Sequence, residues 1–303
     1  MENNKLFLWP QGILIALVAL SVTFSVGLML LIKPNASEAQ SRQSIDINNL
    51  YAAKVGTQQR IEGFKAIMLT SLQQEANIKG FASAAPPSFQ GAIIKAVKLN
   101  QGPKVIALTF DDGPWPETTS QTLDILKKNN IKGTFFVVGR NVKNYPHLAK
   151  RVVAEGHAIA NHTWHHWYHF MNTKAAAYEV DHTTDVIYKT TGVKTNLFRP
   201  PGGIMHNGVT AYARKSKYAI IMWSSDSLDY SRPSVPQLVN NVFRNATPGG
   251  IVLMHDGGGN RSQTVQALPQ IISKFRQQGY SFVTVPELLA MQEKEHQLIA
   301  NKK

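Results

Sequence analysis

The sequence predicts an α/β protein whose main domain is a closed or nearly closed (β/α) barrel of about seven parallel strands. Runs of apolar, largely β-branched residues alternate with segments of helical spacing. The runs are hydrophobic almost without interruption, as in strands that are covered on both faces. A short polar motif follows six of them. Because the carboxyl ends of barrel strands meet on one face, these motifs are expected to converge there.

The first element is a stretch of twenty residues without a charge, residues 13–32. It is long enough to span a bilayer as a helix, so residues 1–33 are interpreted as an uncleaved membrane anchor. A cleaved signal peptide is the alternative, because residues 37–39 (Ser-Glu-Ala) offer a plausible cleavage site. A buried N-terminal core helix is a third interpretation. An anchor predicts a membrane-bound protein with an extracytoplasmic catalytic domain, and a cleaved signal predicts a secreted one.

Residues 34–102 are expected to connect this segment to the catalytic domain. Residues 34–49 are rich in Ser, Asn and Gln and predict a flexible spacer. Apolar residues then recur at helical spacing over about 57–79, which predicts an amphipathic helical stalk that packs on the barrel or self-associates. A second linker, residues 82–90, precedes a lead-in strand over residues 92–99.

The catalytic domain is placed at residues 103–295 and a basic tail at residues 296–303. Its strands are expected at residues 105–110, 134–138, 156–160, 195–198, 218–223, 251–254 and 281–285. Segments with helical spacing separate them, for example Leu148, Val152 and Val153.

Composition limits the chemistry. After the first hundred of the 303 residues, roughly two hundred remain, enough for one barrel-sized domain. The chain has no cysteine, so any metal site must use His, Asp or Glu. The net charge of +13 predicts a solvated basic surface and not one specific partner, and it favours anionic surroundings such as cell-wall polymers or lipid headgroups. Nucleic acid is not an expected partner, because no basic stretch is interleaved with aromatic residues.

His162 and His166 are four residues apart. If the chain turns helical after the third strand, both imidazoles face one side and can bind one metal ion. Asp112 would supply a third ligand and leave positions open for water and substrate, as in catalytic zinc sites. The alternative is a set of surface histidines, since other histidines crowd the same stretch: His157, His165 and His169.

The carboxylates of Asp111 and Asp112 are expected to point apart in extended backbone, so that one binds metal while the other accepts a proton. Asp-Gly-Pro is equally an ordinary turn signal. His255 is expected across the barrel mouth, where it could protonate a leaving group. Asp229 could orient His255, and Arg199 could pair with Asp111.

In their order, these motifs resemble those of the polysaccharide deacetylases, also called carbohydrate esterase family four or the NodB homology domain. The matching motifs are Thr-Phe-Asp-Asp-Gly-Pro, His-x-x-x-His, Arg-Pro-Pro, Asp-x-x-Asp and Leu-Met-His, spread over about residues 103–289. The resemblance implies a distorted (β/α) barrel that removes N-acetyl groups from glycans such as peptidoglycan or chitin-like oligosaccharides. It also implies a divalent metal, with zinc the default, although cobalt, nickel or iron would suit the same ligands.

The resemblance also implies roles for individual residues. Asp112, His162 and His166 match the metal ligands. Asp111 matches the general base, with Arg199 orienting it, and His255 matches the general acid, with Asp229 as its partner. The substrate pocket is expected to be formed by Pro201, Gly202, Tyr230 and Leu253.

Two positions depart from the family pattern: Gly202 stands where an aromatic residue is common, and Tyr230 where Trp is usual. Gly202 keeps the backbone N–H that would help to hold an oxyanion, but it removes an aromatic wall. These two departures motivate a non-catalytic glycan-binding relative as an alternative. An O-acetyl esterase or another amide hydrolase on the same fold also stays open.

Overall fold

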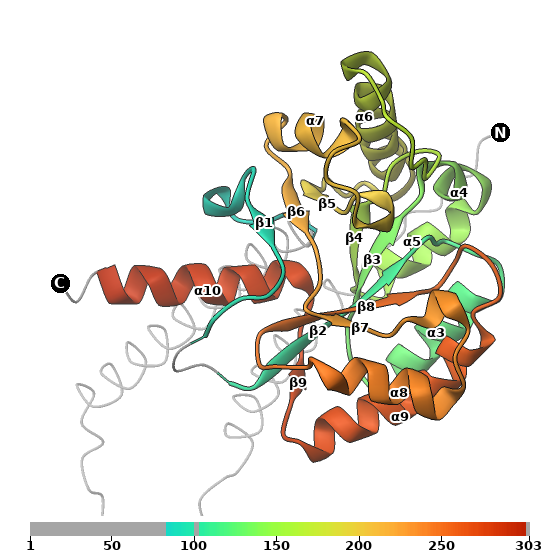
Figure 1. Cartoon of the computed structure of the whole chain (residues 1–303), viewed down its shortest axis with the longest axis vertical. Coiled ribbons are helices and arrows are strands. Elements are labelled where there is room, and N and C mark those ends of the chain that lie inside the picture. Colours follow the sequence, from blue (N-terminus) through green and yellow to red (C-terminus); the bar gives the residue numbers. More distant parts are fainter. Residues whose placement is uncertain (1–82, 100–102, 301–303) are drawn as a thin grey trace, which may run out of the picture. The chain divides into compact units, whose positions relative to one another are not determined.

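The computed structural model describes residues 83–99 and 103–300, and Figure 1 shows their arrangement. The predicted anchor, spacer and amphipathic stalk, which precede residue 83, lie outside the described residues. Within the described residues, no helix is both long and apolar enough to cross a membrane.

The core of the fold is a nine-stranded parallel sheet in the order β1-β6-β5-β4-β3-β2-β8-β7, with β9 paired to the amino end of β2 (Figure 1). The strands are β1 (Ile93–Ile94), β2 (Val105–Asp111), β3 (Thr134–Val137), β4 (Ala158–Asn161), β5 (Leu197–Phe198), β6 (Ala219–Ile221), β7 (Ser225–Asp226), β8 (Gly250–His255) and β9 (Ser281–Phe282). No ladder joins β1 to β7 within the described residues. The expected barrel is therefore an open (β/α) half-barrel.

Eight helices accompany the sheet in the described part of the chain: α3 (Thr118–Lys128), α4 (Gly139–Asn144), α5 (Pro146–Ala154), α6 (Thr173–Thr191), α7 (Val209–Lys215), α8 (Val235–Arg244), α9 (Ser262–Gln277) and α10 (Val285–Ala300). Local signals explain where some of them begin and end. The Asn172 side chain caps α6 by accepting a hydrogen bond from Ala175 N, and Gly192 ends the helix with φ 75°. Ser234 and Gln237 form a capping box at α8.

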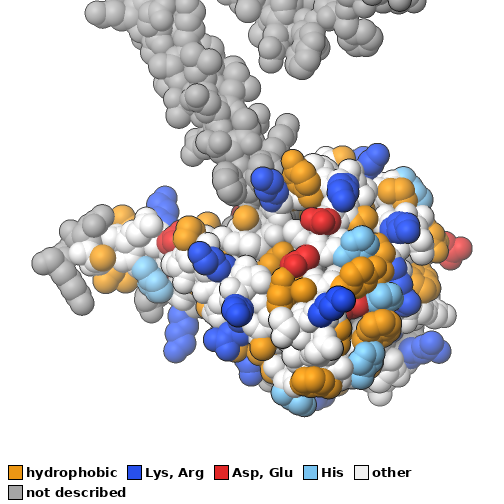
Figure 2. Space-filling view, turned by 90° about the horizontal axis from the view of Figure 1, so that it is seen from above, with side chains coloured by type: hydrophobic (Ala, Val, Ile, Leu, Met, Phe, Trp, Pro, Cys, Tyr) orange, Lys and Arg blue, Asp and Glu red, His pale blue; other side chains and the backbone are white. Residues whose placement is uncertain are grey.

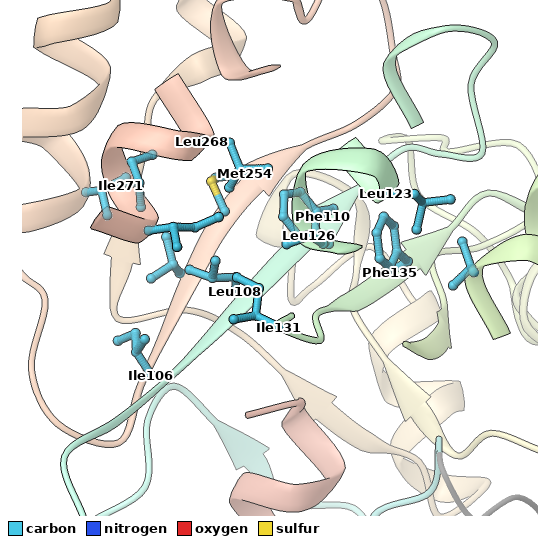
Figure 3. Close-up of a cluster of buried hydrophobic side chains, with 14 of the residues drawn as sticks. Ile106, Leu108, Phe110, Leu123, Leu126, Ile131, Phe135, Met254, Leu268 and Ile271 are labelled. Carbon is cyan, nitrogen blue, oxygen red and sulfur yellow. The ribbon is translucent and has the colours of Figure 1, made fainter. Parts of the chain in front are cut away.

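Successive side chains along each strand point to opposite faces of the sheet, so a separate hydrophobic core forms on each face. In β2, Ile106, Leu108 and Phe110 point outward into a cluster with α3, α5, α8 and α9, part of which is drawn in Figure 3. Val105 and Ala107 point inward, where they join side chains of β3 to β6 and β8 and the first turns of α10. The inward side chains near the carboxyl ends of the strands are the ones that can form a site.

All seven predicted strands are present, and two further strands complete the sheet. β1 was expected as a lead-in strand outside the barrel, but it pairs with β6 and belongs to the sheet. β7 was missed because Ser225 and Asp226 are polar and give no apolar run.

Two expected boundaries also differ. Instead of a free linker, the described part of residues 82–90 is bonded to the sheet. Ser83 Oγ accepts a hydrogen bond from Ile159 N at 2.8 Å, and Thr195 Oγ1 donates to Ser83 O at 2.7 Å. At the other end, α10 continues to Ala300, so the expected tail from residue 296 is helical up to that point.

Candidate active site

A cavity of about 520 Å³ lies at the carboxyl ends of the strands. Its walls contain most of the residues singled out from the sequence: Asp111, Asp112, His162, His166, Gly202, Tyr230, Leu253 and His255. On the face drawn in Figure 2, acidic, basic and histidine side chains lie among hydrophobic ones. The alternation of side chains along the strands explains this convergence. The apolar residues two or four positions earlier point inward, so the side chains of Asp111, Arg199 and His255 point inward as well.

Asp112, His162 and His166 form a compact group whose potential ligand atoms lie within 4.8 Å of one another. His166 Nε2 lies 3.0 Å and His162 Nε2 3.5 Å from Asp112 Oδ1. Two ligand atoms bound to one tetrahedral zinc ion lie about 3.4 Å apart, because each bond is about 2.1 Å long. The spacing therefore suits a single divalent cation.

The position of the proton on His162 also suits a bound cation. Its Nδ1 lies 2.7 Å from the backbone carbonyl of Arg199, which can only accept a hydrogen bond, so Nδ1 carries the proton. In the neutral ring, Nε2 then presents a lone pair toward the Asp112 carboxylate. Asp112 Oδ1 is buried and accepts no hydrogen bond within the described structure. A cation among these atoms would satisfy all of them.

Burial opposes the ionisation of Asp112, but contacts with His162 and His166 outweigh it and hold the pKa of Asp112 well below its usual range. Asp112 is therefore an anion at neutral pH. Carboxylate and neutral imidazole are the forms that bind a metal.

The two histidines lie in a loop after β4, and the helical turn that the sequence suggested is wrong. Thr163 and His166 both have positive φ, 66° and 64°, which folds the loop back on itself. Glu179 of α6 fixes this loop by accepting hydrogen bonds from the backbone N–H groups of Trp164 and His165, at 2.9 and 2.8 Å. The fold of this loop, and not helical spacing, brings the two imidazoles to the same side.

Asp111 and Asp112 do not point apart as expected. Asp112 has φ 75°, so the strand geometry ends at Asp111, and both carboxylates approach the same imidazole. Asp111 Oδ2 lies 3.7 Å from His162 Nε2. Arg199 Nη1 donates to Asp111 Oδ1 at 2.7 Å. Asp111 thus faces the proposed metal position with one oxygen while the other is fixed by Arg199.

Gly113 of the Asp-Gly-Pro motif lies against the loop after β8. A Cβ at Gly113 would lie 2.3 Å from Asp256 Oδ2, so no larger residue fits without movement. Burial raises the pKa of Asp256 to about 7, and a hydrogen bond from Thr119 offsets this only in part. The loop after β2 is thereby packed directly on the loop after β8.

Arg199 is fully buried and makes contacts along its whole guanidinium. Nε donates to Ile221 O at 2.9 Å, Nη1 to Thr109 Oγ1 at 2.9 Å, and Nη2 to Met222 O at 3.2 Å. The guanidinium carbon lies 4.0 Å from the centroid of the Phe136 ring. Arg199 is outside the cavity and acts on it through Asp111.

Replacing Arg199 with methionine will lower the free energy of unfolding by about 3–5 kcal/mol, because the Asp111 carboxylate would be left buried without its cation. Urea unfolding followed by circular dichroism measures this loss. Arg244→Met, at an exposed arginine that ends α8, is the matched control and should change the value by less than about 0.5 kcal/mol. A similarly small change for Arg199→Met would show that the buried pair is dispensable.

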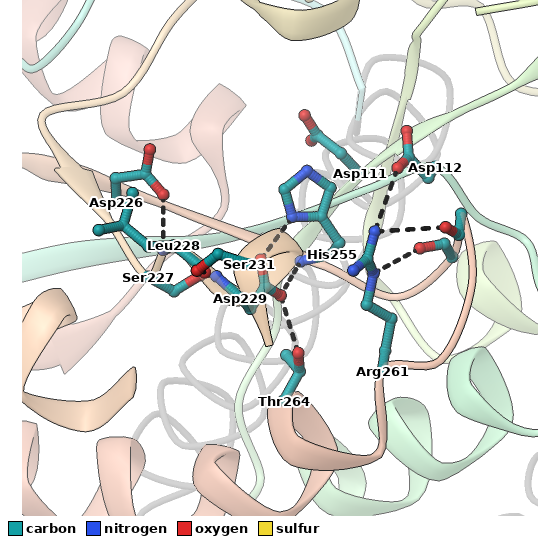
Figure 4. A network of polar contacts seen from close by, with 12 residues as sticks. Asp111, Asp112, Asp226, Ser227, Leu228, Asp229, Ser231, His255, Arg261 and Thr264 are labelled. Carbon is teal, nitrogen blue, oxygen red and sulfur yellow. Dashed lines mark hydrogen bonds and ion pairs between the residues drawn. The ribbon is translucent and has the colours of Figure 1, made fainter. Parts of the chain in front are cut away.

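His255 lies beside the Asp pair, and its expected position across the barrel mouth is wrong. β8 is the neighbour of β2, and His255 is in register with Asp111. Figure 4 shows how Asp229 holds the ring: Asp229 Oδ1 lies 2.6 Å from His255 Nδ1, and Oδ2 accepts from His255 N and from Thr264 Oγ1, each at 2.8 Å. His255 Nε2 is thereby left available to the cavity.

These contacts determine the charge of His255. Burial alone would lower its pKa, but the hydrogen bond and charge of Asp229, with the charges of Asp111 and Asp112, raise it to about 9. Burial opposes the ionisation of Asp229, and its hydrogen bonds with His255 outweigh that effect and lower its pKa. His255 is therefore a cation at neutral pH and can donate a proton.

Of the four expected pocket residues, Gly202, Tyr230 and Leu253 line the cavity. Pro201 is buried and is not among the lining residues, so its assignment to the pocket is not supported by the geometry. The neighbouring Pro200 lines the cavity in its place.

Several cavity residues were not predicted: Trp115, Arg140, Asn141, Tyr168, Trp223 and Arg261. Arg261 is almost fully buried, and its Nη2 lies 3.9 Å from Asp112 Oδ2 (Figure 4). Its Nε donates to Gly257 O at 2.7 Å, which fixes the guanidinium in this position. Arg140 and Asn141 lie in the first turn of α4, Trp223 follows β6, and the other three lie in loops, where no periodicity indicates the direction of a side chain.

The other histidines of the stretch lie outside the group of three. His157 is buried, and its Nδ1 accepts a hydrogen bond from Gly133 N at 3.0 Å. Burial, with the nearby cations Lys132 and Arg151, lowers its pKa to about 4. His165 contacts Glu179 at 2.5 Å, and His169 lies beside the Trp167 ring.

Comparison with known proteins gives a consistent result. Residues 98–221 match the family model described as polysaccharide deacetylase. Over 189 residues the chain is 45% identical to a peptidoglycan-N-acetylglucosamine deacetylase from Bacillus cereus, a match that covers 61% of this chain and 88% of that relative.

Two solved structures illustrate the similarity in fold. One is the Bc1960 peptidoglycan N-acetylglucosamine deacetylase, with a TM-score of 0.61 and 33% identity over 66% of this chain and 94% of that one. The other is wild-type BA3943, a CE4 family pseudoenzyme from Bacillus anthracis, with a TM-score of 0.60 and 33% identity over 66% and 69% of the two chains. Because the second is a pseudoenzyme, the fold alone does not determine activity, and the side chains at the site decide it.

Proposed function

The chain belongs to the polysaccharide deacetylase family, and on this premise we propose the residues that carry its reaction. The protein is a metal-dependent hydrolase that removes N-acetyl groups from N-acetylated glycans and releases acetate. The observation that supports the assignment of residues is the cavity in which three potential metal ligands lie beside a fixed carboxylate and a protonated imidazole.

Asp112, His162 and His166 are the proposed metal ligands, and Zn²⁺ is the proposed ion, although Co²⁺, Ni²⁺ or Fe²⁺ suit the same donors. When bound there, the cation would polarise the acetyl carbonyl and acidify a water molecule. His162 is kept in the ligating tautomer by the Arg199 carbonyl. The open cavity side of the group leaves room for substrate.

Asp111 is the proposed general base. Its Oδ1 is held by Arg199, so Oδ2 is the oxygen that can take the proton of an attacking water molecule. Because Arg199 is buried and fixed by three further acceptors, the carboxylate has little freedom to turn away. Arg199 is therefore a positioning residue.

His255 is the proposed general acid. Its Nδ1 is held by Asp229, so Nε2 is the atom that protonates the departing amine as the amide bond breaks. The backbone N–H of Gly202, on the cavity wall, is the proposed donor to the developing oxyanion. The products are acetate and a free amino sugar.

The proposed substrates are peptidoglycan or chitin-like oligosaccharides, in line with the relatives named peptidoglycan-N-acetylglucosamine deacetylase and chitooligosaccharide deacetylase. Acetate release from peptidoglycan fragments, N-acetylglucosamine oligomers and acetylated xylan tests this. We expect release from the first two, and none from these substrates by Asp111→Asn. Release from xylan alone would favour an O-acetyl esterase. Binding to all three without release would favour a non-catalytic glycan-binding protein.

We further propose that residues 1–33 hold the catalytic domain at the outer side of a membrane, because residues 13–32 carry no charge. Membrane fractionation followed by N-terminal sequencing separates the two interpretations. A membrane-bound chain that keeps residues 1–33 supports the anchor. A released chain that begins near residue 40 supports a cleaved signal peptide.

A further inference from the structure

One stretch of the cavity wall lacks side chains of its own. It consists of Gly202 and Gly203, which have φ values of +58° and +68°. A Cβ built on Gly202 would lie 3.0 Å from Cε1 of Tyr168, and a Cβ on Gly203 would lie 2.9 Å from the Trp223 ring. The space that a side chain at position 202 would enter is therefore already filled by the ring of Tyr168, which comes from the loop between β4 and α6.

Tyr168 lies at the metal-ligand end of the cavity. Its ring stands edge-on to the ring of His166, with centroids 5.2 Å apart and an interplanar angle of 72°. The residue is nevertheless 57% exposed. An exposed aromatic ring on a cavity wall leaves an apolar face available to a bound molecule.

Tyr230 has the same relation to His255 that Tyr168 has to His166. It is 52% exposed and stands edge-on to His255, with centroids 5.9 Å apart and an angle of 85°. The cavity thus has one exposed tyrosine beside the proposed ligand His166 and another beside the proposed acid His255. Both rings are thus presented to a molecule that binds in the cavity.

We propose that Tyr168 contacts the substrate directly and determines its specificity, by providing the aromatic wall that position 202 lacks. This rests on the proposed function for the identity of the substrate, an N-acetylated sugar. The apolar face of a pyranose ring packs against an aromatic ring, so the ring of Tyr168 makes the contact and its hydroxyl is not required. Because Tyr168 is held in the same loop as His166, it positions the sugar relative to the ligand group.

Tyr168→Ala should raise the KM for an N-acetylglucosamine tetramer about tenfold while kcat changes less than about threefold, since the lost contact is made in both the bound substrate and the transition state. Tyr168→Phe should keep the wild-type KM. Tyr188→Ala is the matched control, because Tyr188 is 48% exposed on α6 and is outside the cavity.

A double-mutant cycle with Gly202→Ala tests the contact between the two positions. In the wild-type background, the new methyl group meets the Tyr168 ring and also forces a positive φ on alanine. In the Tyr168→Ala background only the backbone strain remains, so the loss of kcat/KM caused by Gly202→Ala should be smaller there. Equal losses in both backgrounds would mean that the ring does not occupy this space, and the proposal would be wrong.

Calorimetric binding of the tetramer separates this inference from the proposed function. In a His255→Ala background, Tyr168→Ala should weaken the affinity about tenfold, with the metal content unchanged. If the wild-type chain binds the tetramer through Tyr168 but releases no acetate, the proposed function fails and this inference stands. If acetate is released while KM and affinity are unaffected by Tyr168→Ala, or if that variant loses its metal, the inference is overturned.

Discussion

Asp112→Ala will lose its bound divalent cation and at least about 10³-fold in kcat/KM for acetate release, which corresponds to roughly 4 kcal/mol. Asp112 is the only carboxylate among the three proposed ligands in the described structure, and its Oδ1 lies between the two imidazoles. His166→Ala should have the same two effects. Elemental analysis of the purified protein and initial rates on a chitin oligomer measure both quantities.

Asp185→Ala is a suitable control for this prediction, because Asp185 is exposed on α6 and is not among the cavity residues. It should retain its metal and its wild-type rate. An Asp112→Ala protein that is free of metal but fully active would refute the proposed ligand set.

His255→Ala will retain the metal but lose about 10²- to 10⁴-fold in turnover, the usual contribution of a positioned acid. The ring lies beside the ligand group without belonging to it, so its removal affects proton donation and leaves the three ligands in place. Metal analysis and kcat measured on the same preparation distinguish these effects. Simultaneous loss of the metal would count against the acid role.

The pH dependence provides a second measurement on the same residue. The pKa of His255 is raised from 6.5 to about 9, so its acid form persists at neutral pH and is lost as the pH rises through about 9. The rate should fall over that range. The stability that the His255–Asp229 pair contributes should be complete near pH 6.5 and should disappear as the pH rises through about 9, and it should also be lost at acid pH as Asp229 becomes protonated. Asp229→Asn should move the alkaline fall in rate to lower pH, because it removes the main partner charge.

The fold was largely predictable because parallel strands that are buried on both faces appear in the sequence as continuous apolar runs. All seven predicted strands are found, and their inward positions also identify Asp111, Arg199 and His255. β7 could not be predicted, since a two-residue polar strand resembles a loop. The sequence also has no local signal for an open barrel, because closure depends on whether the two edge strands of the sheet pair with each other.

The site was predictable in its membership and less so in its geometry. The pairs Asp111 with Arg199 and His255 with Asp229 lie as the motifs suggested. The direction of the Asp112 carboxylate depends on a positive φ that sequence alone does not reveal. Tyr168 and Arg261 reach the cavity from loops, where no periodicity indicates the direction of a side chain.

The most direct test is a titration of the metal-free wild-type protein with Zn²⁺, with acetate release from a chitin or peptidoglycan oligomer measured at each step. Activity should rise linearly with added metal and reach its plateau at one ion per chain, because one group of three ligands holds one cation beside Asp111 and His255. Acetate release at an undiminished rate before any metal is added would contradict the account.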